Sequence, residues 1–385
     1  MRFPEFEGEW KKVRLGDNCN IQMCKRIMAA QTNTEGGVPF YKIGTIGGKA
    51  DAYISKELFD EYKVKYSFPH KGEVMITCAG TVGKCIIYNG EDSYYQDSNI
   101  VWIDNPNEII SNDFLYHILC KVNWSHLNST TIVRIYNDDL RNLKLYSPQH
   151  DEQKKITHFL SLINERIATQ NKIIEKLETL IKGLNDNIHK DIKGELVCFD
   201  ELGEAYAGLS GKSGDDFGNG EPFITYMNVY QNTYISEKDY ELVQIAPNEK
   251  QNCLQYGDAL FTLSSETPEE VGMGAVYLGN SQKLYLNSFC FGVHFHNDRA
   301  LPQYLAHFIS STSFRKAIYP LAQGSTRFNL QKNDFMKMKF VLPTLEEQER
   351  ISKALDALHC RLANEKLLVG QHLLLKQYLL SQMFI

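Results

Sequence analysis

The chain has 385 residues, of which 43% are hydrophobic and 23% are charged; this length predicts two or three domains, and this composition predicts a folded chain. Its 41 basic and 47 acidic residues leave a net charge of −6, which excludes a protein that holds DNA or an anionic membrane by bulk charge alone. No apolar run of about 18 residues predicts a membrane span, and the acidic N-terminal segment lacks the apolar core of a signal peptide. The nine scattered cysteines contain no C-x-x-C pair, so we expect reduced thiols and a cytoplasmic location.

Short strand-like segments dominate residues 1–147, which we predict to form a first mixed α/β domain. Glycine and asparagine residues separate apolar stretches that have the length of strands. The predicted strands are residues 38–46, 73–80, 84–90 and 99–103, and a helix is expected around residues 114–122.

A long amphipathic helix is predicted over residues 148–193. Its apolar seam consists of Ile156, Leu160, Ile163, Ile167, Ile174, Leu177, Ile181, Leu184 and Ile188. These positions follow a heptad pattern, which is typical of a helix that pairs with another helix. One position of the seam is polar, Gln170, while Pro148 precedes the helix and Gly194 follows it, as expected for its two ends.

The pattern of short strands returns in residues 194–342 and predicts a second mixed domain. The predicted strands are residues 222–230, 258–265, 274–279 and 289–296, and a helix is expected around residues 303–318. A second long helix is predicted over residues 343–385. Its seam consists of Ile351, Leu355, Leu358, Leu362, Glu365 and Val369.

The two long helices belong to an internal repeat with an offset of 195 residues. Residues 148–168, PQHDEQKKITHFLSLINERIA, align with residues 343–363, PTLEEQERISKALDALHCRLA. We therefore predict an α+β fold, with two mixed α/β domains separated by two long helices that pair as an antiparallel coiled coil. At this offset Gln170 falls on Glu365, and antiparallel pairing would bring both together, with Leu177 near Leu358. A buried polar pair can fix the register of a coiled coil; alternatively, both side chains bend out to solvent or to a docked partner.

Motifs of catalysis are missing from the sequence. There is no G-x-x-x-x-G-K-[ST], no H-E-x-x-H, no G-x-S-x-G and no Asn-Pro-Pro-aromatic motif of amino-methyltransferases,. His294 and His296 would face one side of a strand, but no cysteine or acidic residue stands at a suitable spacing, so a structural role is favoured over a metal site,. The neighbouring carboxylates Asp138 and Asp139 are more typical of a turn or helix cap. We therefore expect a non-catalytic chain that itself binds no cofactor and no metal.

Three short motifs resemble those of specificity subunits of type I restriction–modification systems. They are the opening R-F-P-E-F-x-G-x-W-x-x-x-x-L-G-D (residues 2–17), A-G-T-V-G-K (79–84) and the duplicated P-x-x-x-E-Q-x-x-I (148–156 and 343–351). The resemblance implies two target recognition domains, each of which reads one half of a split sequence in double-stranded DNA. It also implies that the helices set the spacer and dock two DNA methyltransferase subunits, which restriction/translocase subunits join. S-adenosylmethionine, ATP and Mg would be bound only by those partners.

Polar loop residues are the candidates for contacts with DNA, because hydrogen bonds to base edges carry sequence information. In the first domain they are Lys25, Arg26, Lys42, Thr45, Thr81, Lys84 and Arg134, in loops that include residues 94–99 and 129–134. In the second domain they are Lys212, Asn228, Ser265, Ser325, Thr326 and Arg327, with Tyr226 and residues 287–288 nearby in the candidate loops. Arg134 and Arg327 are the strongest candidates, because arginine is the side chain that most often pairs with guanine.

Two alternatives come from other classes of protein. The first is a coiled-coil scaffold or adaptor with two domains that bind protein or glycan. The second is a nuclease or methyltransferase whose site has no recognisable motif. Co-purification with a methyltransferase that modifies adenine at a split site would distinguish a specificity subunit from both.

Overall fold

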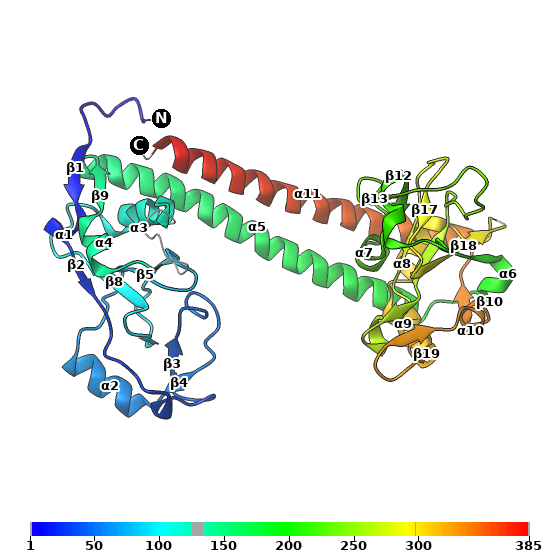
Figure 1. Ribbon diagram of the computed structural model, residues 1–385, viewed down its shortest axis with the longest axis horizontal. Coiled ribbons are helices and arrows are strands. Elements are labelled where there is room, and N and C mark those ends of the chain that lie inside the picture. Colours follow the sequence, from blue (N-terminus) through cyan, green and yellow to red (C-terminus); the bar gives the residue numbers. More distant parts are fainter. Residues whose placement is uncertain (1, 125–133, 297, 384–385) are drawn as a thin grey trace. The chain divides into compact units, whose positions relative to one another are not determined.

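The computed structural model describes residues 2–124, 134–296 and 298–383 (Figure 1). The chain forms two compact units: the first consists of Met1–Gln170 with Leu368–Ile385, and the second of Asn171–Leu367. Each unit contains one mixed domain and a part of both long helices. Among the described residues, none of the helices combines the length and hydrophobicity that a membrane span requires.

Within its described residues, the first unit contains three small sheets and four short α-helices. An antiparallel pair joins β1 (Lys11–Arg14) to β9 (Lys144–Ser147). The central sheet has the order β2 (Asn20–Gln22), β8 (Ile100–Asp104), β5 (Val74–Thr77), β6 (Cys85–Ile87), and the outer sheet has the order β4 (Tyr53–Ile54), β3 (Val38–Tyr41), β7 (Tyr94–Tyr95). The helices are α1 (Leu15–Asn18), α2 (Lys56–Lys65), α3 (Asn112–Lys121) and α4 (Asn137–Asn142).

Among the described residues, the second unit contains sheets that correspond to these three and one further sheet. The pair is β10 (Glu195–Cys198) with β21 (Lys339–Leu342), and the central sheet has the order β11 (Gly203–Ala207), β18 (Cys290–Phe295), β14 (Ala259–Thr262), β16 (Gly274–Val276). The outer sheet has the order β13 (Tyr240–Val243), β12 (Phe217–Ile224), β17 (Tyr285–Leu286), and the added sheet has the order β15 (Ser264–Ser265), β20 (Phe328–Leu330), β19 (Ala322–Gln323). The helices are α6 (Phe199–Leu202), α7 (Tyr226–Gln231), α8 (Pro302–Phe308), α9 (Thr312–Ile318) and α10 (Lys332–Met336).

The central sheet of each unit has an apolar layer on both faces. In β5, Val74 and Ile76 belong to the core beneath the long helices, whereas Met75 belongs to the core beneath the outer sheet. In β14, Phe261 belongs to the core beneath the long helices, and Leu260 belongs to the core beneath the outer sheet. Successive side chains of a strand point to opposite faces, so a strand that is covered on both faces must be apolar throughout.

The two long helices are α5 (His150–Lys190) and α11 (Leu345–Met383) (Figure 1). In the first unit, Leu160 near the start of α5 shares a core with Leu379 near the end of α11. In the second unit, Leu184 near the end of α5 packs against the core that contains Leu355 near the start of α11. The helices are therefore antiparallel within each unit.

The two polar seam residues are both buried, with exposed fractions of 5% for Gln170 and 1% for Glu365. The alternative in which they bend out to solvent is therefore wrong. Glu365 Oε1 lies 2.5 Å from Arg361 Nη2, an ion pair along α11 that the heptad pattern did not indicate. The pairing of Gln170 with Glu365 stays a prediction.

Four predicted elements differ from the structure. The strand expected over residues 258–265 is divided into β14 and β15, which belong to different sheets. Local hydrogen bonds explain two of the other three differences. The strand expected over residues 222–230 ends at Ile224, because Thr225 Oγ1 accepts from Asn228 N at 3.2 Å and caps α7. The helix expected over residues 303–318 is divided into α8 and α9, and the Ser311 hydroxyl caps the second of them. The strand expected over residues 38–46 ends at Tyr41, after which the chain turns.

Candidate functional site

The topology of each unit brings loops that are distant in sequence to one place. β3 lies parallel to β7, and β12 lies parallel to β17. The loops that follow two parallel neighbours leave the sheet at the same edge. In each unit this edge has a cavity, and residues predicted to contact DNA line both cavities.

The cavity of the second unit has a volume of about 850 Å³. It is lined by Tyr226, Met227, Tyr230, Ser264, Ser265, Glu266, Glu270, Phe289, Thr326 and Arg327. Three of the predicted residues, Ser265, Thr326 and Arg327, therefore meet here, while Ser325 is exposed beside them. The guanidinium carbon of Arg327 lies 5.4 Å from the ring centroid of Phe289, within the range of a cation–π interaction.

Hydrogen bonds fix the positions of several other side chains that line this cavity. Tyr230 donates its hydroxyl to Glu270 Oε1 at 2.8 Å, and Ser265 donates to Glu270 Oε2 at 3.2 Å. The hydrogen bond from Tyr230 is the main cause that holds the pKa of Glu270 below its usual range. Tyr226 donates to the carbonyl of Ser264 at 2.8 Å. The cavity thus presents an arginine, two carboxylates and aromatic rings in a defined arrangement.

The corresponding cavity of the first unit has a volume of about 340 Å³. It is lined by Arg26, Ile27, Ala29, Thr32, Phe40, Lys42, Gln96, Asp97, Ser98 and Asn99. Arg26 Nε donates to Asp97 Oδ2 at 2.8 Å, and Lys42 Nζ lies 3.0 Å from Asp51 Oδ1. Two predicted residues, Arg26 and Lys42, are therefore brought together with the predicted loop 94–99.

Arg134 connects to the same cavity through this loop. Its Nη2 donates to the carbonyl of Ser98 at 3.1 Å. Ser98 has a φ of 53°, a left-handed conformation that is uncommon outside glycine. In the second unit Arg327 contacts Phe289, which lies in the loop between the outer-sheet strand β17 and the central strand β18. This loop corresponds to the loop of Ser98 in the first unit. An arginine that precedes the last strand of a unit thus reaches the same loop in both. Residues 129–133 of the predicted loop lie outside the described residues.

The remaining candidates of the first unit lie in other loops. Lys25 Nζ stands 5.4 Å from the ring centroid of Tyr66, and Lys84 Nζ donates to the carbonyl of Ile46 at 2.5 Å. Thr45 Oγ1 accepts from Lys42 N at 3.0 Å, so its hydroxyl stabilises a turn. Thr81 is exposed, and its carbonyl accepts from the Thr77 hydroxyl. These four residues do not line the cavity of Arg26 and Lys42.

Lys212 and Asn228 do not fit a role in contacting DNA. Lys212 has a side chain that is only 7% exposed, and its Nζ donates to Glu249 Oε2 at 2.6 Å. Asn228 is fully buried, and its Nδ2 donates to the carbonyls of Ser236 and Asp239. Both were predicted from residue type, but their polar atoms hold loops of the second unit together.

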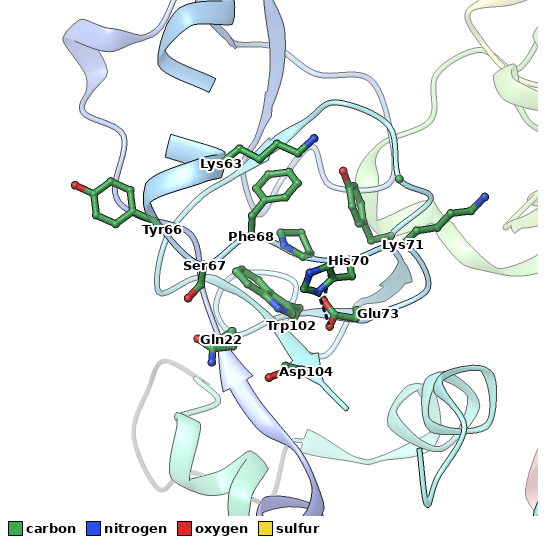
Figure 2. Close-up of a pocket in the computed structure, with 13 residues that line it drawn as sticks. Gln22, Lys63, Tyr66, Ser67, Phe68, His70, Lys71, Glu73, Trp102 and Asp104 are labelled. Carbon is green, nitrogen blue, oxygen red and sulfur yellow. Dashed lines mark hydrogen bonds and ion pairs between the residues drawn. The ribbon is translucent and has the colours of Figure 1, made fainter. Parts of the chain in front are cut away.

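A further cavity of about 530 Å³ lies in the first unit between the end of α2 and the central sheet. Figure 2 shows its labelled side chains, with Trp102 on the sheet and Lys63 at the end of α2. Glu73 accepts from the backbone N of His70 at 2.7 Å and lies 3.4 Å from its ring Nδ1. Lys63 Nζ donates to Asp92 at 3.2 Å. None of the predicted contact residues lines this cavity.

Comparison with known proteins identifies the family. The model of the type I restriction modification DNA specificity domain matches this chain twice, over residues 7–179 and 195–368. The chain belongs to this family. Each match contains most of one mixed domain, together with the cavity at the edge of its outer sheet. The internal repeat is therefore a repeat of specificity domains.

Relatives and a solved structure agree with this assignment. A Haemophilus influenzae protein named as a type I restriction enzyme specificity subunit is 46% identical over 172 residues, which cover 45% of this chain and 44% of that relative. The type I restriction enzyme MjaVIII specificity subunit of Methanocaldococcus jannaschii is 23% identical over 396 residues, covering 93% of this chain and 87% of that protein. The crystal structure of a type I restriction–modification system S subunit from M. genitalium has a similar fold, with a TM-score of 0.57, 13% identity, and coverage of 100% of this chain and 99% of that one. The match to the Haemophilus protein thus spans less than half of its length.

The duplicated P-x-x-x-E-Q motif has a structural role in each specificity domain. Gln153 Nε2 donates to the carbonyl of Pro148 at 3.1 Å, and its Oε1 accepts from Ser111 N, directly before α3, at 2.7 Å. Gln348 likewise donates to the carbonyl of Pro343 at 2.9 Å and accepts from Leu301 N, directly before α8, at 2.8 Å. The motif therefore ties the start of each long helix to the start of a helix in its domain.

His294 of the second specificity domain makes contacts inside the fold. His294 Nδ1 lies 2.8 Å from Asp258 Oδ1, and the ring stacks on Tyr206 with centroids 4.0 Å apart. Within the part of the chain that the structure describes, no group of three or more His, Cys, Asp or Glu side chains could hold a metal ion. The structural role favoured for His294 agrees with these contacts.

Several residues of the cavity in the second specificity domain were not predicted from the sequence. Phe289 belongs to the strand predicted over residues 289–296, but it precedes β18 and is 52% exposed. Tyr230 and Glu270 were not candidates, although each lies only a few residues from a predicted one. The nearby predicted residues could have drawn attention to Tyr230 and Glu270. The parallel pairing of β12 with β17, which brings Phe289 to this cavity, was not predictable from the local sequence pattern.

Proposed function

We propose that this chain is the DNA-recognition subunit of a type I restriction–modification complex, in which each specificity domain reads one half of a split target. One observation carries the proposal. Both domains place an arginine against the loop that enters the central sheet, beside a cavity lined by polar loop residues. Two copies of one reading surface suit a target with two separate halves.

The charge of the chain is consistent with reading bases more than with gripping phosphates. Phosphate contacts position a protein on DNA, whereas hydrogen bonds to base edges specify the sequence. A chain with a net charge of −6 binds DNA weakly when alone. In this proposal the partner subunits supply most of the contacts to the DNA backbone.

The long helices dock the partners in this proposal. Several large apolar side chains of α11 are exposed, namely Leu367, Leu373, Leu374, Leu375 and Tyr378. Exposed apolar residues of this kind are typical of a protein–protein interface. We assign this helix to two DNA methyltransferase subunits, which bind S-adenosylmethionine, and the helices set the spacer between the half-sites. Restriction/translocase subunits, which use ATP and Mg, join that complex, and the chain described here contributes no catalytic group.

Expression with the proteins encoded beside this chain tests the proposal. The expected result is a stable complex with a methyltransferase that modifies adenine within a split sequence, whereas the purified chain alone binds the same duplex weakly and modifies nothing. Tight sequence-specific binding by the isolated chain would contradict the assigned division of labour. A complex that contains no methyltransferase would favour a scaffold or adaptor function instead.

A further inference from the structure

Arg327 differs from the other arginines of the second unit in the state of its N–H groups. The others are bonded within the protein: Arg299 to Glu195, Arg315 to the carbonyls of Glu269, Val271 and Gly272, Arg350 to Glu347, and Arg361 to Glu365. Arg327 makes no hydrogen bond or ion pair with any residue that the structure describes, and its side chain is exposed. Its donors are therefore available to a ligand.

Phe289 holds the available guanidinium in place. The guanidinium carbon stands 5.4 Å from the ring centroid, and Phe289, which lines the cavity, is 52% exposed. A cation–π interaction restrains the position of an arginine without using its N–H groups. The arginine is thus positioned in advance for a planar partner with two acceptors.

The charges around Arg327 distinguish between a phosphate and a base as that partner. Arg327 is the one basic residue among the described residues that line the cavity, whereas Glu266 and Glu270 contribute two carboxylates. Two carboxylates repel a phosphate, but a carboxylate accepts a hydrogen bond from an amino group of a base. Glu270 already accepts from Tyr230 and Ser265. Glu266 is exposed and has no partner among the described residues, so it remains the available acceptor.

We infer that this cavity reads a G·C base pair in the second half of the target. Arg327 donates two N–H groups to O6 and N7 of guanine, and Glu266 accepts from the N4 amino group of cytosine. These are the acceptors and the donor that a G·C pair presents in the major groove. The inference rests on the proposed function, since it assigns the base chemistry of one of its two reading surfaces.

The experiment measures methylation by the complete complex of this chain with its methyltransferase partner. The target of the wild-type complex is determined first, and synthetic duplexes then carry an A·T pair in place of each G·C pair of the second half-site. Arg327→Ala should reduce the preference for one of these G·C pairs by about 5- to 150-fold, which is the discrimination that a bidentate contact provides. Glu266→Gln should weaken selection at that same pair. Because Arg327 is exposed, the variant should fold normally, which circular dichroism checks.

Lys316→Ala is the matched control, since Lys316 is an exposed basic residue of α9 that does not line the cavity. It should change neither half of the target. If Arg327→Ala lowers the methylation rate of all duplexes by the same factor, the inference is overturned, because Arg327 would then be a phosphate contact. An unchanged preference would overturn it as well. Both results leave the proposed function intact, whereas a wild-type complex without any sequence preference would refute the proposed function itself.

Discussion

The glutamine of the duplicated motif provides a quantitative test of how each long helix is attached to its domain. Gln153 is 1% exposed. Its Oε1 accepts from Ser111 N at 2.7 Å, and its Nε2 donates to the carbonyls of Ile109 and Pro148 at 2.9 and 3.1 Å. We therefore predict that Gln153→Ala destabilises the first unit strongly.

The magnitude follows from the groups that lose their partner. A buried donor without a partner costs about 1–3 kcal/mol, and each lost hydrogen bond contributes about 1 kcal/mol. With the N–H of Ser111 and two carbonyls affected, we expect a loss of roughly 2–4 kcal/mol in the free energy of unfolding. For a unit of this size that loss lowers Tm by roughly 4–16 °C.

Thermal unfolding followed by circular dichroism measures the effect. Gln149→Ala is the matched control, because Gln149 is an exposed glutamine just before α5. It should leave Tm close to that of the wild type. If Gln153→Ala unfolds at the same temperature as Gln149→Ala, the motif does not anchor the helix, and the explanation of its duplication is wrong.

Three further predictions concern residues that hold the fold together and a residue that we assign to target recognition. Lys212→Ala should destabilise the second unit and leave the target sequence unchanged, because Lys212 binds Glu249 inside the fold; an altered target would contradict this. Hydrogen bonds from Lys212 first, and then from Gln251 and the backbone of Ala246, together lower the pKa of Glu249 to about 2, so the stabilisation is complete above pH 4.5 and disappears as the pH falls toward 2; Glu249→Gln should remove this part of the pH dependence in urea titrations. Arg134→Ala should relax selection at one position of the first half-site by about 1–3 kcal/mol, and methylome mapping that shows loss only in the second half-site would refute its assignment.

Local patterns in the sequence predicted the parts of the fold that depend on local interactions. The seams from Ile156 to Ile188 and from Ile351 to Val369 continue over several heptads, and α5 and α11 are continuous helices there. The prediction for the segment 226–231 was wrong. It was expected to belong mostly to a strand, because a short apolar run fits both a strand and a helix. The Thr225 hydroxyl, which caps α7, decides between them.

The candidate site was less predictable, because it depends on contacts between distant segments. β12 pairs with β17 across about 60 residues of chain, and this pairing brings Phe289 to Tyr226 and Arg327. Residue type alone could not separate Arg327, whose donors are available, from Lys212, whose ammonium group is buried against Glu249. Burial and charge partners, which decide the role of a polar side chain, arise only in the folded unit.

Exchange of one recognition domain tests whether each domain reads one half of the target. Residues 1–147 are replaced with the corresponding segment of a relative that has a different target, while both long helices and the second domain are kept, and the methylated sequence is mapped across a genome. We expect one half of the split sequence to change to that of the relative, and the other half and the spacer to stay the same. A change in both halves, or in neither, would contradict it.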